Sequence, residues 1–470
     1  MREHENKAHG GGVSGPPHAD GGAVPGRVRT DRLGRAHVER ARSFSPEDCP
    51  VPARRRHGPV ETGWEDADDE SSRRRVLDDA MAGPSPVTAP DPEDRDRVLM
   101  TWTVREPGAV SVLLDANGLF AAGGVEALTM TRLAGTDVWT CTWSVPADWC
   151  ASYGIAAWRG RGAPPWCGLD GRPARLAIMR AAGPDPRASR TVAGSFGPAR
   201  SVAAGPDAPA PPWEGPAGER RPRARPAGRR GRVHELSVPM RADAGRGGPV
   251  NRDGRGEEGA ERVWVYEPGG APASGTPVLL LFDGQIWLRR MGLVRALDAL
   301  IASGELPPLH VAMVDSRDQG DYRAEHLGVP GGQVDLVIDG LLPVLRSRFD
   351  VSPLGADTIV SGQSYGALAS LWALALADGE IGHAIALSPS LWRFDVGRAL
   401  AACPRWLTAR LLAGTFEGRM LVDARALAHV LRGRDVAVTP VSGGHDWAWW
   451  SVRMILELVD LLSAGSDETS

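Results

Sequence analysis

The sequence has almost no lysine, and it lacks a long apolar run. Lys7 is the only lysine among the 54 basic residues, so arginine carries nearly all of the positive charge. The formal net charge is −4, which gives no reason to expect a nucleic acid partner. The longest apolar stretch, residues 367–377, is well short of the ~18 apolar residues that suggest a membrane helix. We therefore expect no membrane span.

Cysteine is also scarce. The five cysteines form no CxxC pair, so the sequence suggests neither a zinc site nor a dense disulfide framework. We expect free thiols in a reducing compartment, although a Cys141–Cys150 bridge stays open. The polar N-terminus has no apolar segment typical of a secretory signal. These absences favour a cytoplasmic protein without a metal or other cofactor of its own.

Glycine and proline, by contrast, are abundant and cluster in two stretches. Residues 1–95 have too few apolar side chains to offset the entropy of ordering, so we expect a disordered N-terminal segment. Residues 183–232 are rich in Pro, Ala and Arg. Their basic run, Glu219–Arg232, contains no aromatic residues. This composition is typical of a solvated linker.

Two folded domains are expected between and after these stretches. Residues 96–182 contain short β-like segments separated by turn residues, which predict a small β-sandwich. Residues 233–464 alternate strand-like and helix-like segments, which predicts an α/β domain with a mostly parallel sheet, followed by a tail at 465–470. The strands expected in this domain are Glu261–Tyr266, Val278–Phe282, His310–Val314, Asp357–Val360, Ala384–Leu387 and Arg419–Val422.

The strongest motif is a G-x-S-x-G pentapeptide centred on Ser364. It follows an expected strand and precedes an expected helix, which is the context of the nucleophile elbow in α/β-hydrolases. Side chains at positions 362 and 366 would collide with neighbouring backbone in so tight a turn. We therefore predict that Ser364 is a nucleophile at the carboxyl end of the sheet.

A serine hydroxyl needs a general base, and in this fold the histidine comes last in chain order. His445 meets this requirement, because it follows two glycines and precedes the last expected helix. The acid should lie between Ser364 and His445. Glu417 is the preferred candidate, Asp423 is the second, and a Ser–His dyad without an acid is a third possibility.

Backbone amides are the expected stabilisers of the oxyanion. The amide of Tyr365 lies at the start of the helix after the nucleophile. The second donor usually comes from a loop after an early strand, which makes the amide of Gly284 or Gln285 the candidate. The neighbouring Asp283 could instead cap the next helix.

These residues resemble those of the enterochelin (ferric enterobactin) esterase family, within the wider esterase D group. The resemblance includes Gly362–Gly366, Ser388-Pro-Ser390 and Gly443–Asp446 in matching order, and it extends to residues 98–104, 135–139 and 152–153 in the N-terminal part. It implies an α/β-hydrolase domain preceded by an immunoglobulin-like β-sandwich.

The resemblance also implies a reaction. Members of the family hydrolyse the ester bonds of catecholate siderophores, often as the iron complex, and so release iron inside the cell. Ser364, His445 and Glu417 carry over as catalytic residues, and Arg323 becomes a candidate for binding the anionic catecholate. The alternative for Arg323 is an ordinary surface ion pair. The aromatic residues that could line the substrate pocket are Trp287, Trp392 and Trp450.

Two other functions stay open. The glycine-rich segment 328–334 departs from the family pattern, and the motif does not select the acyl group. An esterase or acyltransferase that acts on another acyl ester is therefore one alternative. A non-catalytic siderophore-binding protein that keeps a vestigial elbow is the other.

Overall fold

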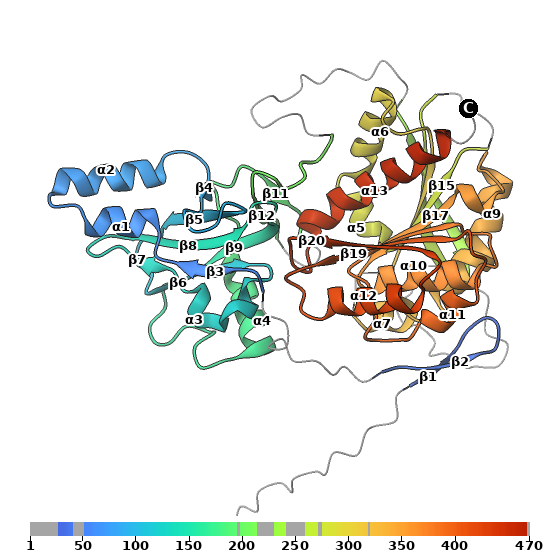
Figure 1. Cartoon of the computed structure of the whole chain (residues 1–470), viewed down its shortest axis with the longest axis horizontal. Helices are drawn as coiled ribbons and strands as arrows, with labels where there is room; N and C mark the ends of the chain where they lie inside the picture. The colour runs from blue at the N-terminus through green and yellow to red at the C-terminus, as the bar shows by residue number, and fades with distance from the viewer. Residues whose placement is uncertain are drawn as a thin grey trace, which may run out of the picture.

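The computed structural model shows two folded parts that lie side by side (Figure 1). It describes residues 27–40, 51–194, 198–213, 230–240, 259–270, 275–317 and 320–467. Within this described part of the chain, no helix combines the length and the apolar character needed to cross a bilayer.

The C-terminal part is built on one eight-stranded sheet, in the order β13-β14-β16-β15-β17-β18-β19-β20. β13, β14 and β16 pair antiparallel, and every pair from β16 to β20 is parallel. The strands are β13 (Arg232–Pro239), β14 (Ala260–Glu267), β15 (Val278–Leu281), β16 (His310–Val314), β17 (Thr358–Gln363), β18 (His383–Leu387), β19 (Thr408–Gly414) and β20 (Asp435–Val441). The expected α/β domain with a mostly parallel sheet is confirmed.

Helices cover both faces of this sheet, because its central strands are apolar on both sides. In β15, Val278 and Leu280 join one core, and Leu279 and Leu281 join the other. On the second face lie α5 (Gly284–Arg289), α6 (Leu293–Ser303) and α13 (Trp447–Asp467). On the first face lie α8 (Gln333–Asp335), the π-helical turn η3 (Leu336–Leu341), α9 (Leu342–Arg348), α10 (Tyr365–Leu376), α11 (Gly397–Ala401) and α12 (Met420–Val430). A short helix, α7 (Asp321–His326), follows β16.

The N-terminal part consists of two antiparallel sheets that share one apolar core. Trp102 and Trp143 come from one sheet, Tyr153 comes from the other, and all three are buried in this core. The strands of the first sheet are β3 (Arg54–Arg56), β4 (Val87–Pro90), β5 (Arg97–Arg105), β7 (Thr131–Arg132) and β8 (Val138–Pro146); those of the second are β6 (Ser111–Ala116), β9 (Cys150–Trp158), β10 (Ala182–Gly183), β11 (Thr191–Val192) and β12 (Arg200–Ala204). The helices are α3 (Gly124–Leu128) and α4 (Gly171–Ala181). The immunoglobulin-like topology of this part stays a prediction.

The expectation of disorder is wrong for the described residues of the N-terminal segment; residues 1–26 and 41–50 lie outside the description. Residues 51–95 contain β3, β4, α1 (Pro59–Glu65) and α2 (Glu70–Met81), and residues 27–40 form a hairpin of β1 (Val28–Thr30) and β2 (Ala36–Val38). β3 joins the sheet through backbone pairing with β8, which needs no apolar side chain. The hairpin docks on the distant C-terminal part through ion pairs of Arg27 and Arg29 with Glu325. Composition does not report such long-range partners.

Three other expectations need correction. The proposed linker 183–232 supplies β11 and β12, so the N-terminal part extends past residue 182; residues 195–197 and 214–229 lie outside the description. Residues 419–422 lie at the start of α12, whose buried Leu421, Ala424 and Leu427 recur at helical spacing. The helix α13 continues to Asp467, into the expected tail. The sequence analysis did not predict β19 and β20, the last two strands of the sheet.

The two parts interdigitate at their boundary. Phe416, from a loop of the C-terminal part, lies in the core of the N-terminal part. Cys150 and Val202, from β9 and β12, lie in the core beneath α13. Cys141 and Cys150 are both buried free thiols, so no bridge joins them. The interface is therefore a shared apolar layer.

Candidate active site

Ser364 occupies a strained backbone position between β17 and α10. Its φ is 58° and its ψ is −115°, a region that residues with a side chain rarely adopt. A Cβ at Gly362 would lie 2.6 Å from the backbone carbon of Gly366. A Cβ at Gly366 would meet the Cβ of Phe282 at 3.2 Å. The predicted elbow, with its strand, helix and two glycines, is confirmed as a structure.

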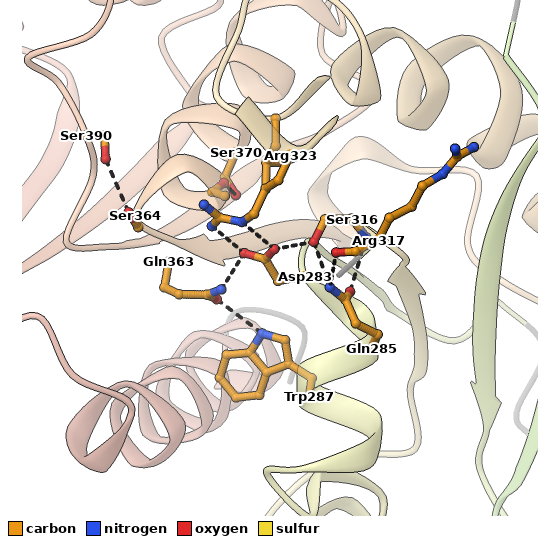
Figure 2. Close-up of polar contacts among 12 residues, drawn as sticks. Asp283, Gln285, Trp287, Ser316, Arg317, Arg323, Gln363, Ser364, Ser370 and Ser390 are labelled. Carbon is orange, nitrogen blue, oxygen red and sulfur yellow. Dashed lines mark hydrogen bonds and ion pairs between the residues drawn. The ribbon is translucent and has the colours of Figure 1, made fainter. Parts of the chain in front are cut away.

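The Ser364 hydroxyl faces the loop after β18. Its Oγ lies 3.4 Å from Ser390 Oγ. A dashed line joins these two hydroxyls in Figure 2. Among the described residues, no hydrogen bond joins Ser364 to His445. Catalytic hydrogen bonds are often long or misaligned before a substrate is bound.

Glu417 and His445 lie in direct contact. The Oε2 atom of Glu417 is 3.0 Å from Nδ1 of His445. The Glu417 side chain is only 1% exposed, whereas that of His445 is 38% exposed. Glu417 Oε1 accepts hydrogen bonds from the amide of Gly414 at 3.0 Å and from the hydroxyl of Ser388 at 2.6 Å. The structure thus brings together the preferred acid and the predicted base.

The alternative acid lies elsewhere. Asp423 is on α12 and pairs with Arg419 one helical turn away, at 3.3 Å. Its carboxylate is therefore engaged within its own helix. This arrangement favours Glu417 over Asp423 as the partner of His445.

Two residues near the pair were not singled out from the sequence for the roles they have here. Trp450 had been proposed as a pocket residue, but it is buried, donates from Nε1 to Ser388 Oγ at 2.8 Å, and packs edge-on against the His445 ring. Asn117, in the N-terminal part, donates from Nδ2 to the His445 carbonyl at 3.0 Å. Only the turn residues around Asn117 could have marked it, since its partner is 328 positions away.

The candidate oxyanion donors lie at the first turns of α10 and α5. Tyr365 is the first residue of α10, where amide groups have no acceptor within the helix. Gly284 and Gln285 begin α5 and are buried. A Cβ at Gly284 would lie 2.4 Å from the backbone carbon of Met313, so only glycine lets α5 pack this closely on β16.

A buried ion pair anchors the start of α5. Asp283 has a φ of 56° and makes no capping bond, so the helix-cap alternative is wrong. Instead, Arg323 donates to both Asp283 oxygens, from Nε at 2.8 Å and from Nη2 at 2.7 Å (Figure 2). Ser316 and Gln363 also donate to the Asp283 carboxylate.

These contacts determine the pKa of Arg323 and the role that its side chain has. Burial alone would lower its pKa, but the adjacent Asp283 carboxylate outweighs burial and raises the pKa of Arg323. The side chain is only 13% exposed, so it is not an ordinary surface ion pair. Because Asp283 holds two of the guanidinium nitrogens, the geometry favours a role in holding the α5 turn over the predicted contact with substrate.

The other two candidate pocket residues, Trp287 and Trp392, lie in different surroundings. Trp287 is fully buried, with its Nε1 3.2 Å from Gln363 Oε1 and its ring against Trp447, so it belongs to the core. Trp392 is half-buried, and its ring lies 6.0 Å from that of Tyr365. It also lines a pocket of about 380 Å³. The charged residues of this pocket are Arg40, Asp395, Arg398, Arg419 and Asp423.

Comparisons with family models cover most of the chain. Residues 99–214 match the model described as "Enterochelin esterase, N-terminal", and residues 258–461 match the model described as "Putative esterase". The iron(III) salmochelin esterase of Escherichia coli O6:H1 is 26% identical over 387 residues, which are 77% of this chain and 87% of that protein. The iron(III) enterobactin esterase of Dickeya dadantii is 28% identical over 317 residues, 64% of this chain and 68% of that protein.

Solved structures agree in fold. The ferric enterobactin esterase of Salmonella typhimurium superposes with a TM-score of 0.65 and 23% identity, over 83% of this chain and 99% of that chain. The enterobactin esterase of Shigella flexneri, solved in the presence of enterobactin, superposes with a TM-score of 0.63 and 22% identity, over 85% of this chain and 99% of that chain. Both matches extend over the N-terminal and the C-terminal part.

Proposed function

We propose that this chain, a carboxylic ester hydrolase similar to the enterochelin esterases, hydrolyses the ester bonds of a catecholate siderophore. The substrate is an enterobactin-like trilactone, taken as its ferric complex. Hydrolysis opens the ligand and releases iron in the cytoplasm. Iron enters only as part of the substrate, and the chemistry uses no resident cofactor.

In the proposed reaction, Ser364 is the nucleophile and His445 is the general base. Glu417 holds the Nδ1–H of His445, which leaves Nε2 free to accept the proton of Ser364. The Ser364 hydroxyl exchanges Ser390 for His445 when the substrate binds. The contact between Glu417 and His445, at the sheet edge where Ser364 also lies, is the observation that carries the proposal.

The acyl transfer then follows two steps. Ser364 Oγ attacks the ester carbonyl, and the oxyanion is stabilised by the amides of Tyr365 and of Gly284 or Gln285. The intermediate collapses to an acyl-serine, and His445 returns its proton to the departing alcohol. A water molecule, deprotonated by His445, hydrolyses the acyl-serine and releases the acid.

The pocket beside Trp392 supports an anionic aromatic substrate. The Trp392 ring lines this pocket, whose lining includes neither Ser364 nor His445, and it lies 6.0 Å from the ring of Tyr365. Arg40, Arg398 and Arg419 bring guanidinium groups to the same pocket, and such groups suit the negative charge of a ferric catecholate. Asp395 and Asp423 pair with two of these arginines, at 2.7 Å and 3.3 Å.

The test compares a ferric catecholate trilactone with p-nitrophenyl esters, in the wild type and in Ser364→Ala. We expect turnover of the trilactone, and a loss of kcat by more than about a thousandfold in the variant. Fluorophosphonate should label the wild type and not Ser364→Ala. Turnover of simple esters alone would indicate another acyl substrate, and an unlabelled wild type that still binds the ferric complex would indicate a binding protein.

A further inference from the structure

A turn of the N-terminal part, residues 115–118, lies between the two loops that carry Glu417 and His445. The Asn117 amide donates to the His445 carbonyl at 3.0 Å. The approach is close, since a Cβ at Gly444 would lie 2.3 Å from Asn117 Oδ1. On the other side, a Cβ at Gly118, whose φ is 90°, would lie 2.7 Å from the Cβ of Phe416. One turn thus contacts the neighbours of both the base and the acid.

Strand β9 holds the same histidine loop at further points. The Cys150 amide donates to the Ser442 carbonyl at 2.9 Å, and the Ser152 amide donates to the carboxylate of Asp446. Asp446 is almost fully buried, and burial raises its pKa, while the amides of Ala448 and Ser152 oppose that shift. The residues on both sides of His445 are therefore bound to the N-terminal part.

The turn itself is rigidly held. The backbone N–H of Asn117 donates to the Ser152 carbonyl at 2.9 Å. Arg200 pairs with the Asp115 carboxylate at 2.8 Å and donates to the Asp115 carbonyl at 2.6 Å. The side chain of Asn117 consequently projects from a fixed backbone.

We propose that Asn117 is a positioning residue for the catalytic pair, so that the N-terminal part completes the active site. This inference rests on the proposed function of Ser364, His445 and Glu417. The loop before His445 contains Gly443 and Gly444, which restrain the backbone weakly. The Asn117 contact adds a restraint at His445 itself to those at Ser442 and Asp446, and so keeps the imidazole against Glu417. A shift of about 1 Å in such a group can lower a rate by about a hundredfold.

The experiment uses the full chain with Asn117→Ala and Asn117→Asp. A matched control is Arg105→Gln, which breaks an exposed ion pair with Asp137 in the same part of the protein. In Asn117→Ala we expect kcat to fall about tenfold with KM changed less than about twofold, because orientation is lost and substrate contacts are kept. In Asn117→Asp we also expect the acidic limb of kcat/KM to move to higher pH, because a carboxylate near His445 favours the imidazolium.

Fluorophosphonate labelling separates this inference from the proposed function. If Ser364 is labelled and the wild type hydrolyses ester, but both Asn117 variants match Arg105→Gln in kcat and pH profile, the positioning role is wrong and the esterase stands. If Ser364→Ala keeps full activity, the proposed function itself is wrong. If Asn117→Ala lowers both kcat and the melting temperature, and Asn117→Asp leaves the pH profile of kcat/KM unshifted, the contact is purely structural and the positioning role is wrong.

Discussion

At the scale of single residues, Glu417 is held by three groups at once. Its two oxygens contact Ser388, the Gly414 amide and His445, and almost none of its side chain is exposed. Such a carboxylate can orient an imidazole and stabilise its protonated form. Trp450 completes a closed ring of contacts, since it donates to Ser388 and packs against His445.

We expect Glu417→Gln to lower kcat by about a thousandfold to ten-thousandfold, because the amide cannot stabilise the imidazolium and can favour the wrong tautomer. KM and the melting temperature should change little. The measurement is steady-state hydrolysis of the substrate that the wild type turns over.

Asp423→Asn is the matched control for this prediction. It removes the other candidate acid, which lies on α12 and contacts Arg419. We expect kcat to stay within about twofold of the wild type and any change to fall on KM, because Asp423 lines the pocket beside Trp392. If Asp423→Asn were the inactive variant and Glu417→Gln the active one, the assignment of the acid would be reversed.

At the scale of elements, the site depends on helices that approach neighbouring backbone very closely. Ser364 is raised by the contact between Gly362 and Gly366 at the start of α10. The start of α5 rests on the backbone of β16 at Gly284, and the ion pair between Asp283 and Arg323 fastens the same turn. Both candidate oxyanion donors thus come from turns that tolerate no added volume.

Gly284→Ala is expected to destabilise the protein by about 1–3 kcal/mol, because its Cβ would overlap the Met313 backbone. It should also lower kcat, since α5 must shift away from the nucleophile. Thermal unfolding and steady-state kinetics on the same preparations measure both effects.

Gly183→Ala provides the comparison, because a Cβ there meets no atom within 4 Å. This variant should match the wild type in both measurements. A stable and fully active Gly284→Ala protein would show that α5 is not constrained as we describe.

At the scale of the whole molecule, distant segments are joined by buried polar groups as well as by shared cores. Three histidines, His310, His326 and His383, have a lowered pKa, and burial is the largest cause for each. His383 bridges β18 and β19, with Nδ1 2.7 Å from Thr408 Oγ1. Folding keeps these rings neutral.

Stability should therefore fall on acidification. A group whose pKa is lowered by folding binds more protons when unfolded, so its contribution is present above its ordinary pKa and is lost as the pH falls through the folded value. We expect the melting temperature to drop by at least about 2 °C between pH 7.5 and pH 5.5.

Two histidine variants make this prediction specific. His383→Gln should reduce the pH dependence of the melting temperature, because it removes one of the three titrating rings. His429→Gln, at an exposed position on α12, is the control for the loss of a histidine outside the buried set. A melting temperature that is constant over this pH range would contradict the prediction.

Local pattern was enough to predict the elbow around Ser364, the position of His445 in the loop before the last helix, and the general alternation of strands and helices. Each of these depends on residues near one another in the chain: two glycines around a serine, or apolar residues at the period of a strand. Glu417 could only be ranked above Asp423, since both lie in the right interval. Their distinct surroundings come from different elements, a loop after β19 and the face of α12.

Partners that lie far away in sequence could not be predicted. Arg323 forms an ion pair with Asp283, 40 positions away, and Trp287 packs against Trp447 of the last helix, α13. The hairpin of residues 27–40 contacts the C-terminal part through ion pairs with Glu325, which lies 298 positions after Arg27 and 296 after Arg29. Burial and pairing of this kind depend on packing, which composition does not encode.

The sequence by itself determined that a serine in a strained turn lies between a buried strand and a helix and that a histidine precedes the last helix, because glycine content and apolar period act through neighbouring residues. Only the tertiary structure decided which carboxylate meets that histidine and that Asn117 contacts its backbone from another part of the chain. The physical reason is that a hydrogen bond needs atoms within about 3 Å, and only the folded chain sets that distance.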